Sequence, residues 1–274
     1  MALYANTRWA LRHLTGRLCN DLLLGTVTSP GSGTFICAES GWEKPDDHFN
    51  EYVEMFCYSG TGVGTSGNPT DWDNTAHTLT FKPAATLTAG DLVEMHRTFM
   101  VNEYNDYINL AIDMVANEAL INKVDVSILL DDQTFVYDIP AQFLYIQSLE
   151  LESSTADLYN LAEPIDRRYW RIVRGTTPQI EFVKEYYTPT DGRDLRITGL
   201  ASPSKLDVDT EECPINPAYV TYQAAALLHQ SRIRGQDADS EYHASQMTLC
   251  QSMADRERAR LRVSLGGSIP VVEA

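Results

Sequence analysis

The sequence lacks the cysteine pairing that a zinc site or a disulfide framework requires. Its cysteines are scattered and odd in number, and none falls in a C-x-x-C pair. This pattern predicts reduced thiols in the core of a protein made in a cytoplasm. The five are Cys19, Cys37, Cys57, Cys213 and Cys250.

Long apolar runs are also missing. No run approaches the roughly 18 residues that a membrane span needs. The opening stretch MALYANTRWALRHL lacks the basic-then-apolar plan of a signal peptide. We therefore expect a protein that neither enters a membrane nor is exported.

Basic residues are scarce as well. Lysine and arginine number 21 against 38 aspartates and glutamates, which gives a net charge of -17. Phosphate-driven binding to nucleic acid needs the opposite balance, so we expect nonspecific affinity for DNA to be weak. With 274 residues, 43% of them hydrophobic, the chain can hold one large or two moderate globular domains.

Catalytic motifs are absent from the sequence. It contains no G-x-S-x-G elbow and no H-E-x-x-H pair. His229 and His243 fall on two expected helices and can face each other, a spacing that favours polar core or rim positions over metal ligation. The sequence therefore predicts no catalytic residue, no cofactor-binding residue and no metal ligand.

One stretch, Gly62–Gly67, matches G-x-G-x-x-G after a plausible strand. A dinucleotide fold needs a helix directly afterwards, but a turn-rich segment follows. We interpret the stretch as a flexible β loop. Within the next segment, Asp71, Asp73 and Asn74 are expected to cap turns, since no glycine and distal glutamate complete a calcium loop.

Four segments carry the apolar spacing of amphipathic helices. In the first, Gly25 stands where a left-handed C-terminal cap would lie. In the third, Asn216 and Pro217 form a favourable helix start. In the last, Tyr242 and Leu249 lie on one side with Met253 and Leu261. The segments are 6–24, 102–122, 216–234 and 237–261.

Because an isolated amphipathic helix is marginal in water, we expect the four to pack together. The remaining segments alternate like strands. The pattern from Val124 to Ile139, with a turn at 131–133, predicts a hairpin. The predicted fold class is α+β: a four-helix bundle core with two β-rich insertions, a small β domain and a β-sandwich or barrel-like domain. Its parts are bundle helix 1 (1–32), a β insertion (33–100), bundle helix 2 (101–122), a sandwich-like insertion (123–212), a helical hairpin (213–263) and an extended tail (264–274).

The C-terminal end reverses the acidic trend. Four arginines alternate at the end of the last helix, where cations complement the helix dipole. They could equally dock an acidic partner or a neighbouring subunit. The apolar-tipped tail should become ordered when it finds a groove or a sheet edge. The arginines are Arg256, Arg258, Arg260 and Arg262.

The order of segments resembles the head-to-tail connector, or adaptor, proteins of tailed bacteriophages. The opening helix TRWALRHLTGRLCNDLLLG precedes the loop YSGTGVGTSG and the strand phrase HTLTFKPAATLTAGDLVEMH. The helix EYNDYINLAIDMVANEAL and the phrase VYDIPAQFLYIQSLEL come next, then YWRIVRG and the segment from DLRITGL to LLHQSRI. These phrases span nearly the whole chain, and their order carries the resemblance.

This resemblance implies a structural virion protein at the neck, made in the host cytoplasm. It implies a homo-oligomeric ring, dodecameric in related adaptors, that joins the portal protein above to the next neck or tail protein below and leaves a channel for genomic DNA. The implied portal interface consists of Arg256, Arg258, Arg260, Arg262, Pro270, Val271 and Val272.

Three other interpretations remain open at this point. A tail terminator or tail-tube subunit would also be a ring with β domains. A carbohydrate-binding virion protein could use Trp42, Trp72 and Trp170 as stacking platforms. An enzyme could use the Gly62–Gly67 loop for a nucleotide.

Overall fold

The computed structural model describes residues 6–153, 158–159, 163–233, 239–261 and 269–271. The chain divides into two compact units. Unit 1 comprises 1–114 with 205–260, and unit 2 comprises 115–204 with 261–274. Each unit is therefore assembled from two separate stretches of the chain.

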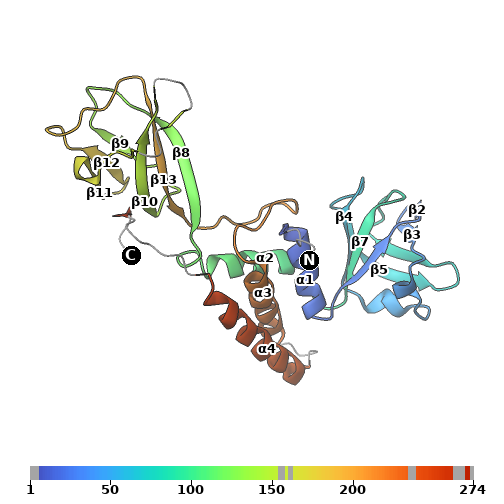
Figure 1. The fold of residues 1–274 in the computed structure, drawn as a ribbon. Coiled ribbons are helices and arrows are strands. Elements are labelled where there is room, and N and C mark those ends of the chain that lie inside the picture. The colour runs from blue at the N-terminus through green and yellow to red at the C-terminus, as the bar shows by residue number, and fades with distance from the viewer. Residues whose placement is uncertain (1–5, 154–157, 160–162, 234–238, 262–268, 272–274) are drawn as a thin grey trace. The chain divides into compact units, whose positions relative to one another are not determined.

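Unit 1 contains a seven-stranded antiparallel sheet in the order β1-β7-β4-β5-β6-β3-β2 (Figure 1). The two end strands are consecutive in the chain and only two residues apart, so the sheet curls until its ends meet. The strands are β1 (Leu23–Thr26), β2 (Ser29–Gly31), β3 (Thr34–Ile36), β4 (Glu54–Ser59), β5 (Ser66–Asp73), β6 (Thr78–Lys82) and β7 (Leu92–His96).

The inside of this sheet is filled by apolar side chains at alternating strand positions. Trp42 and Trp72 lie at its centre with Phe49, with ring centroids 5.1 to 5.7 Å apart. Strand β1 approaches this cluster so closely that a Cβ on Gly25 would lie 2.6 Å from the ring of Trp42. Glycine at this position thus serves packing against tryptophan. Two short 3-10 helices, Ser40–Trp42 and His48–Glu51, lie beside the sheet.

Four α-helices complete unit 1. Helix α3 packs against α1, α2 and α4, whereas α4 packs principally on α3 (Figure 1). The predicted start of α3 is confirmed, because the Asn216 side chain accepts a hydrogen bond from the Ala218 amide and Pro217 takes the first helical position. The helices are α1 (Arg8–Leu18), α2 (Val101–Asp113), α3 (Pro217–Arg232) and α4 (Ser240–Arg258).

The first helix ends earlier than the sequence predicts. Its last helical residue is Leu18, and the left-handed residue that follows is Asn20, with a φ of 53°. Asparagine tolerates this conformation better than most residues. The prediction of a C-terminal cap at Gly25 is therefore wrong, since that glycine lies within β1.

The prediction of a four-helix bundle core is also wrong. The described residues form mostly strands, in three antiparallel sheets, with four helices. Apolar cores lie inside the sheets of both units as well as between the helices. On α4, Tyr242 and Leu249 were expected to face a bundle but are 40% and 50% exposed. Amphipathic spacing identified the helices but could not show that three sheets, two of them sharing a core of their own, would make up so much of the fold.

Unit 2 contains a four-stranded sheet, β14-β10-β13-β8, and a three-stranded sheet, β11-β12-β9, both antiparallel. Side chains from both sheets share one apolar core. The strands are β8 (Ile121–Leu129), β9 (Val136–Asp138), β10 (Tyr145–Leu151), β11 (Trp170–Val173), β12 (Gln179–Phe182), β13 (Asp194–Ala201) and β14 (Ile269–Pro270), with a 3-10 helix at Arg167–Tyr169.

The predicted hairpin between Val124 and Ile139 does not form. Strand β8 pairs with β13 and strand β9 pairs with β12, so the two strands lie in different sheets. The turn between them is held by the Tyr137 hydroxyl, which accepts a hydrogen bond from the Asp131 amide and contacts the Thr134 carbonyl. Alternation identified both strands, but it contains no information about their partners.

Candidate functional sites

The predicted portal residues are divided between the two units. Arg256, Arg258 and Arg260 lie at the end of α4 in unit 1, whereas Pro270 and Val271 belong to unit 2. Arg262 and Val272 lie outside the described residues. The assignment of these seven residues to a portal interface stays a prediction.

The arginines at the end of α4 differ in their surroundings. Arg256 and Arg260 are exposed, and Arg258 is half-buried. Arg260 forms an ion pair with Glu257 at 2.8 Å, one turn earlier. Arg256 is exposed, and no ion pair engages it among the residues that the structure describes.

The tail segment completes a sheet in unit 2. Strand β14 pairs with β10, where Ile269 lies opposite Ile146 and Pro270 lies opposite Tyr145. The amide of the next residue, Val271, donates to the Leu144 carbonyl at 2.8 Å, and its side chain is only 2% exposed. The tail was expected to find a sheet edge in a partner; the edge it occupies here belongs to its own chain.

A buried ionic cluster lies between α1 and strand β7 in unit 1. The Arg12 guanidinium donates through Nε to Glu94 Oε1 at 2.6 Å. It also donates to both carboxylate oxygens of Asp209, at 3.0 and 2.8 Å, and to Asn105 Oδ1 at 3.1 Å. His13 Nε2 lies 2.5 Å from the second oxygen of Glu94. The cluster therefore joins the first helix, the sheet, α2 and the segment before α3.

A second group of polar side chains continues from this cluster. His96 Nδ1 lies 3.0 Å from the Asp21 carbonyl oxygen, and Nε2 lies 3.7 Å from Glu94 Oε1. The Asp21 carboxylate accepts hydrogen bonds from the amides of Arg97, Thr98 and Phe99 and from the Tyr104 hydroxyl. These bonds fix the turn that leads from β7 into α2.

The charges in this cluster are stabilised by one another. Burial alone would lower the pKa of His96, but the nearby carboxyl groups of Asp21 and Glu94 raise it to about 9. Burial alone would raise the pKa of Glu94, but His13, His96 and Arg12 hold it well below its usual range. Arg12 and Glu94 are fully buried. Since no substrate can reach them in this conformation, the cluster positions the helices against the sheet.

The facing of His229 and His243 is confirmed by the structure. Their Nδ1 atoms lie 2.8 Å apart across the α3–α4 contact, and both rings are buried near Phe99. Burial and the neighbouring His243 lower the pKa of His229 to about 4. At such a distance one ring must donate and the other accept, so the neutral pair is the stable form.

The glycine-rich stretch Gly62–Gly67 connects β4 to β5, and no helix follows it. The amides of Thr61 and Gly62 donate to the Asp91 carboxylate at 2.7 and 3.1 Å. Burial alone would raise the pKa of Asp91, but hydrogen bonds from Thr88, Gly62 and Thr61 lower it. The Asp91 carboxylate thus occupies the backbone amides that a phosphate would need. A nucleotide-binding role for this loop therefore loses its support.

Short polar residues cap turns in the same sheet. Asp73 Oδ1 accepts from the amides of Thr75 and Ala76 at 2.8 and 3.0 Å, and Asp46 accepts from the Asn74 amide at 2.8 Å. These bonds confirm the predicted turn-capping role of Asp73 and add Asp46 as a cap that was not predicted. Within the described residues, no group of three or more His, Cys, Asp or Glu side chains is placed to hold a metal ion.

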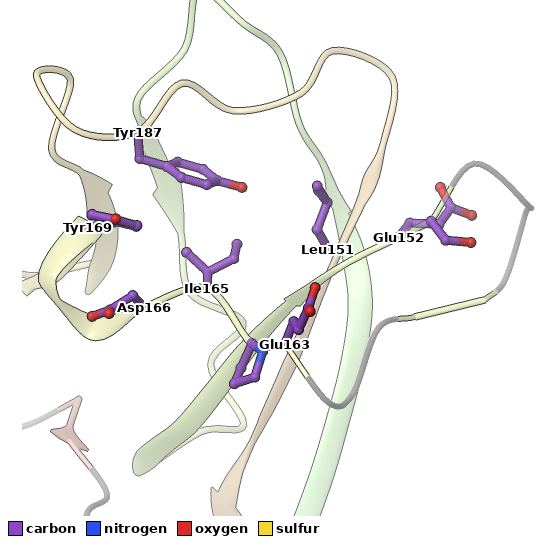
Figure 2. A pocket seen from close by; sticks show the side chains of 9 residues that line it. Leu151, Glu152, Glu163, Ile165, Asp166, Tyr169 and Tyr187 are labelled. Atoms are coloured by element: carbon purple, nitrogen blue, oxygen red, sulfur yellow. The ribbon is translucent and has the colours of Figure 1, made fainter.

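An open acidic pocket of about 400 Å³ lies in unit 2 (Figure 2). Tyr169 and Tyr187 form one side, with ring centroids 6.1 Å apart and an angle of 20° between the rings. Glu152, Glu163 and Asp166 supply carboxylates. Asp166 already binds Arg168 at 2.7 Å, so its charge is largely compensated within the chain. The lining residues are Leu151, Glu152, Ser153, Glu163, Pro164, Ile165, Asp166, Tyr169 and Tyr187.

The tryptophans offered as carbohydrate platforms are buried. Trp42 and Trp72 lie in the core of unit 1, and Trp170 lies in the core of unit 2. A stacking platform must expose a ring face, so this role for the three tryptophans is wrong. The five cysteines are free thiols and all are buried, as the sequence predicts.

No protein-family model matches the chain, and no curated protein sequence matches it. No helix in the part of the chain that the structure describes is long and apolar enough to cross a membrane.

Two functional features were missed from the sequence. One is the buried cluster, whose signal was available in the strand LVEMH, where Glu94 and His96 share one face of an otherwise apolar strand. The other is a pair of exposed apolar helix faces in unit 1. On α2, Leu110 and Met114 are 42% and 43% exposed, and α4 exposes Tyr242 and Leu249.

Proposed function

We propose that this chain is a structural virion subunit of a tailed-bacteriophage neck. In this proposal it acts as a head-to-tail adaptor that forms a ring beneath the portal protein and joins it to the next neck or tail component. The ring body is unit 1, with its curled sheet and helices, in place of a helical bundle.

The observation that carries the proposal is the apolar surface left uncovered on two helices of unit 1. Leu110, Met114 and Leu249 project into solvent from a chain whose net charge is -17. Exposed apolar faces on a highly charged protein are typical of assembly surfaces. The order of sequence phrases, which resembles the adaptor family, supports the choice of assembly.

The acidic surface supports the passage of DNA through the ring. A net charge of -17 repels phosphates, so DNA that crosses the channel would not be held. The exposed Arg260, two residues beyond the end of α4, is a local exception, and it supplies donors for carboxylates on the portal.

The test mixes the purified chain with the portal ring of the same virion and images the product. We expect a ring of this chain on one end of the portal, and the variant Arg260→Glu should bind the portal at least about tenfold more weakly. This side chain is exposed, so the variant should fold normally. A chain that forms no complex with the portal at micromolar concentration would contradict the proposal.

A tail terminator or tail-tube subunit is the second candidate. The dominance of antiparallel sheets favours it, because the helical bundle that argued for an adaptor is not formed. Adding purified tail tubes to the same experiment separates the two functions. Binding to tubes without binding to the portal would favour the terminator.

A further inference from the structure

Helix α4 presents a continuous stripe of side chains that its own chain does not cover. Tyr242, Leu249, Met253, Arg256 and Arg260 are separated by seven, four, three and four residues, which places them along one side of a helix. Tyr242 and Leu249 are exposed and Met253 is half-buried. The stripe is therefore apolar over most of its length and basic at its C-terminal end.

Helix α2 presents a second stripe with the opposite charge. Asp106, Leu110 and Met114 follow one another at intervals of four residues, and all three are exposed. Their acidic end lies toward the start of the helix and their apolar end toward its C-terminus. No ion pair engages Asp106 within the described residues, so its carboxylate is available to a cation from outside the unit.

The two stripes match when the helices run antiparallel. If Leu249 lies against Met114, a step of four residues brings Met253 to Leu110, about 6 Å along each axis. A further step places Arg256 about 10.5 Å from Leu249, while Asp106 lies about 12 Å from Met114. The apolar pairs and the ion pair thus coincide within about 1.5 Å, one residue's rise. A parallel alignment would carry Arg256 past the end of α2 and away from Asp106.

The stripes cannot meet within one copy. Helix α3 packs against both α2 and α4, and those two helices make no substantial contact with each other. A contact between different faces of identical subunits is heterologous, and such contacts close into rings when the rotation allows. The apolar and charged residues of the two stripes follow one another in matching order. The partner that fits each stripe is therefore a second copy of this chain.

We infer that the α4 stripe of one copy docks antiparallel on the α2 stripe of the next copy, with Arg256 paired to Asp106 of that copy. The inference rests on the proposed ring function and names the surfaces that build it. Because each copy uses α4 on one side and α2 on the other, every copy in the ring makes the same contact twice.

The test measures self-association of the full chain by sedimentation velocity, without portal. We expect Arg256→Asp and Asp106→Arg each to weaken association by about tenfold or more. The double variant carrying both changes should return to within about threefold of the natural chain, because the reversed pair restores attraction. Leu249→Asp should abolish association, and Leu129→Asp, a change at an exposed residue of β8, should leave it unchanged.

A second measurement distinguishes weakened self-association from a folding defect. Thermal unfolding of each variant should match that of the natural chain, since all four positions are exposed. Single charge reversals that leave self-association unchanged would overturn the inference. A double variant that associates no more tightly than the weaker-associating single variant would also overturn it. So would a natural chain that is monomeric at every concentration. Portal binding is measured in a separate assay. If the variants still form a ring on the portal, the α4–α2 contact is rejected but the proposed adaptor function is not.

Discussion

Arg12 is the residue on which the attachment of the first helix to the sheet depends. Its guanidinium binds Glu94 and Asp209 in a fully buried setting and stacks over the Phe56 ring at 5.2 Å. Arginine suits this place because its planar fork can serve several carboxylates at once. A lysine would satisfy one of them and remove an ion pair from the other.

Replacing Arg12 should therefore destabilise unit 1 strongly. The variant Arg12→Met keeps most of the side-chain volume but leaves Glu94 without its principal cation. We expect a loss of about 3 to 5 kcal/mol in the free energy of unfolding, the usual cost of breaking a buried pair. Urea denaturation followed by tryptophan fluorescence measures it. The exposed pair Arg171–Glu181 provides the control, where Arg171→Met should leave the free energy of unfolding nearly unchanged.

The sequence predicted the environment of apolar residues better than that of charged ones. The α2 positions expected on a buried stripe, including Tyr104 and Ile108, are buried. Arg12 and Glu94 were missed because a charged residue is normally expected at the surface, and its burial depends on partners about 80 to 200 residues away in the chain. Periodicity in a local segment contains no information about such partners.

At the scale of elements, the α3–α4 hairpin depends on the protonation state of two histidines. His229 and His243 share one hydrogen bond, and protonating both would place two cations 2.8 Å apart. The other charged groups beside them are Arg232, which further opposes protonation of His243, and Asp239 and Asp21, which favour protonation. Acid should therefore weaken this contact.

The pH dependence follows from the direction of the shift. The folded-state pKa of His229 is lowered to about 4, below its ordinary value, so the unfolded chain binds the proton more readily. The contribution to stability is present above about pH 6.5 and is lost as the pH falls toward 4. We expect the thermal midpoint of unit 1 to fall across this range by calorimetry. The variant His229→Asn keeps a polar group near the position of Nδ1, and in it the thermal midpoint should depend less steeply on pH. An unchanged dependence on pH would show that other groups cause the effect.

Strand pairing was the part of the element-scale prediction that failed most clearly. The alternation in β8 and β9 identified two strands, but each pairs with a strand more than 40 residues later in the chain. All four helices form where they were predicted, but the first two end earlier, at Leu18 and Asp113. Their packing partners were not predicted, since the exposed side of α4 contains residues that the sequence assigned to a core. Spacing defines a face, and only the complete fold determines what covers it.

At the scale of the whole molecule, unit 2 takes part of its core from the far end of the described chain. Val271 packs among side chains of both sheets of that unit. The variant Val271→Asp would bury an unpaired charge there, and we expect it to lower the free energy of unfolding of unit 2 by about 3 kcal/mol or more. Hydrogen exchange of β10 and β13 amides measures this.

The matched control is again Leu129→Asp, at a position 62% exposed in the same unit. It should change stability by less than about 0.5 kcal/mol. If the β10 amides exchange as slowly in the variant Val271→Asp as in the natural chain, strand β14 is dispensable for the sheet. A portal-binding assay that removes the tail must therefore be accompanied by this stability measurement, since tail removal alters unit 2 itself.

The interleaving of the two units also determines when they can be completed during synthesis. Helices α3 and α4 emerge after all but the last strand of unit 2, and β14 and Val271 emerge after α4. Neither unit can close its core until residues beyond 250 have left the ribosome. The first β sheet can form while the chain is still being made, but α2 and α4 take up their final packing only later. Contacts between copies through these helices are therefore delayed until residues beyond 250 have been synthesised.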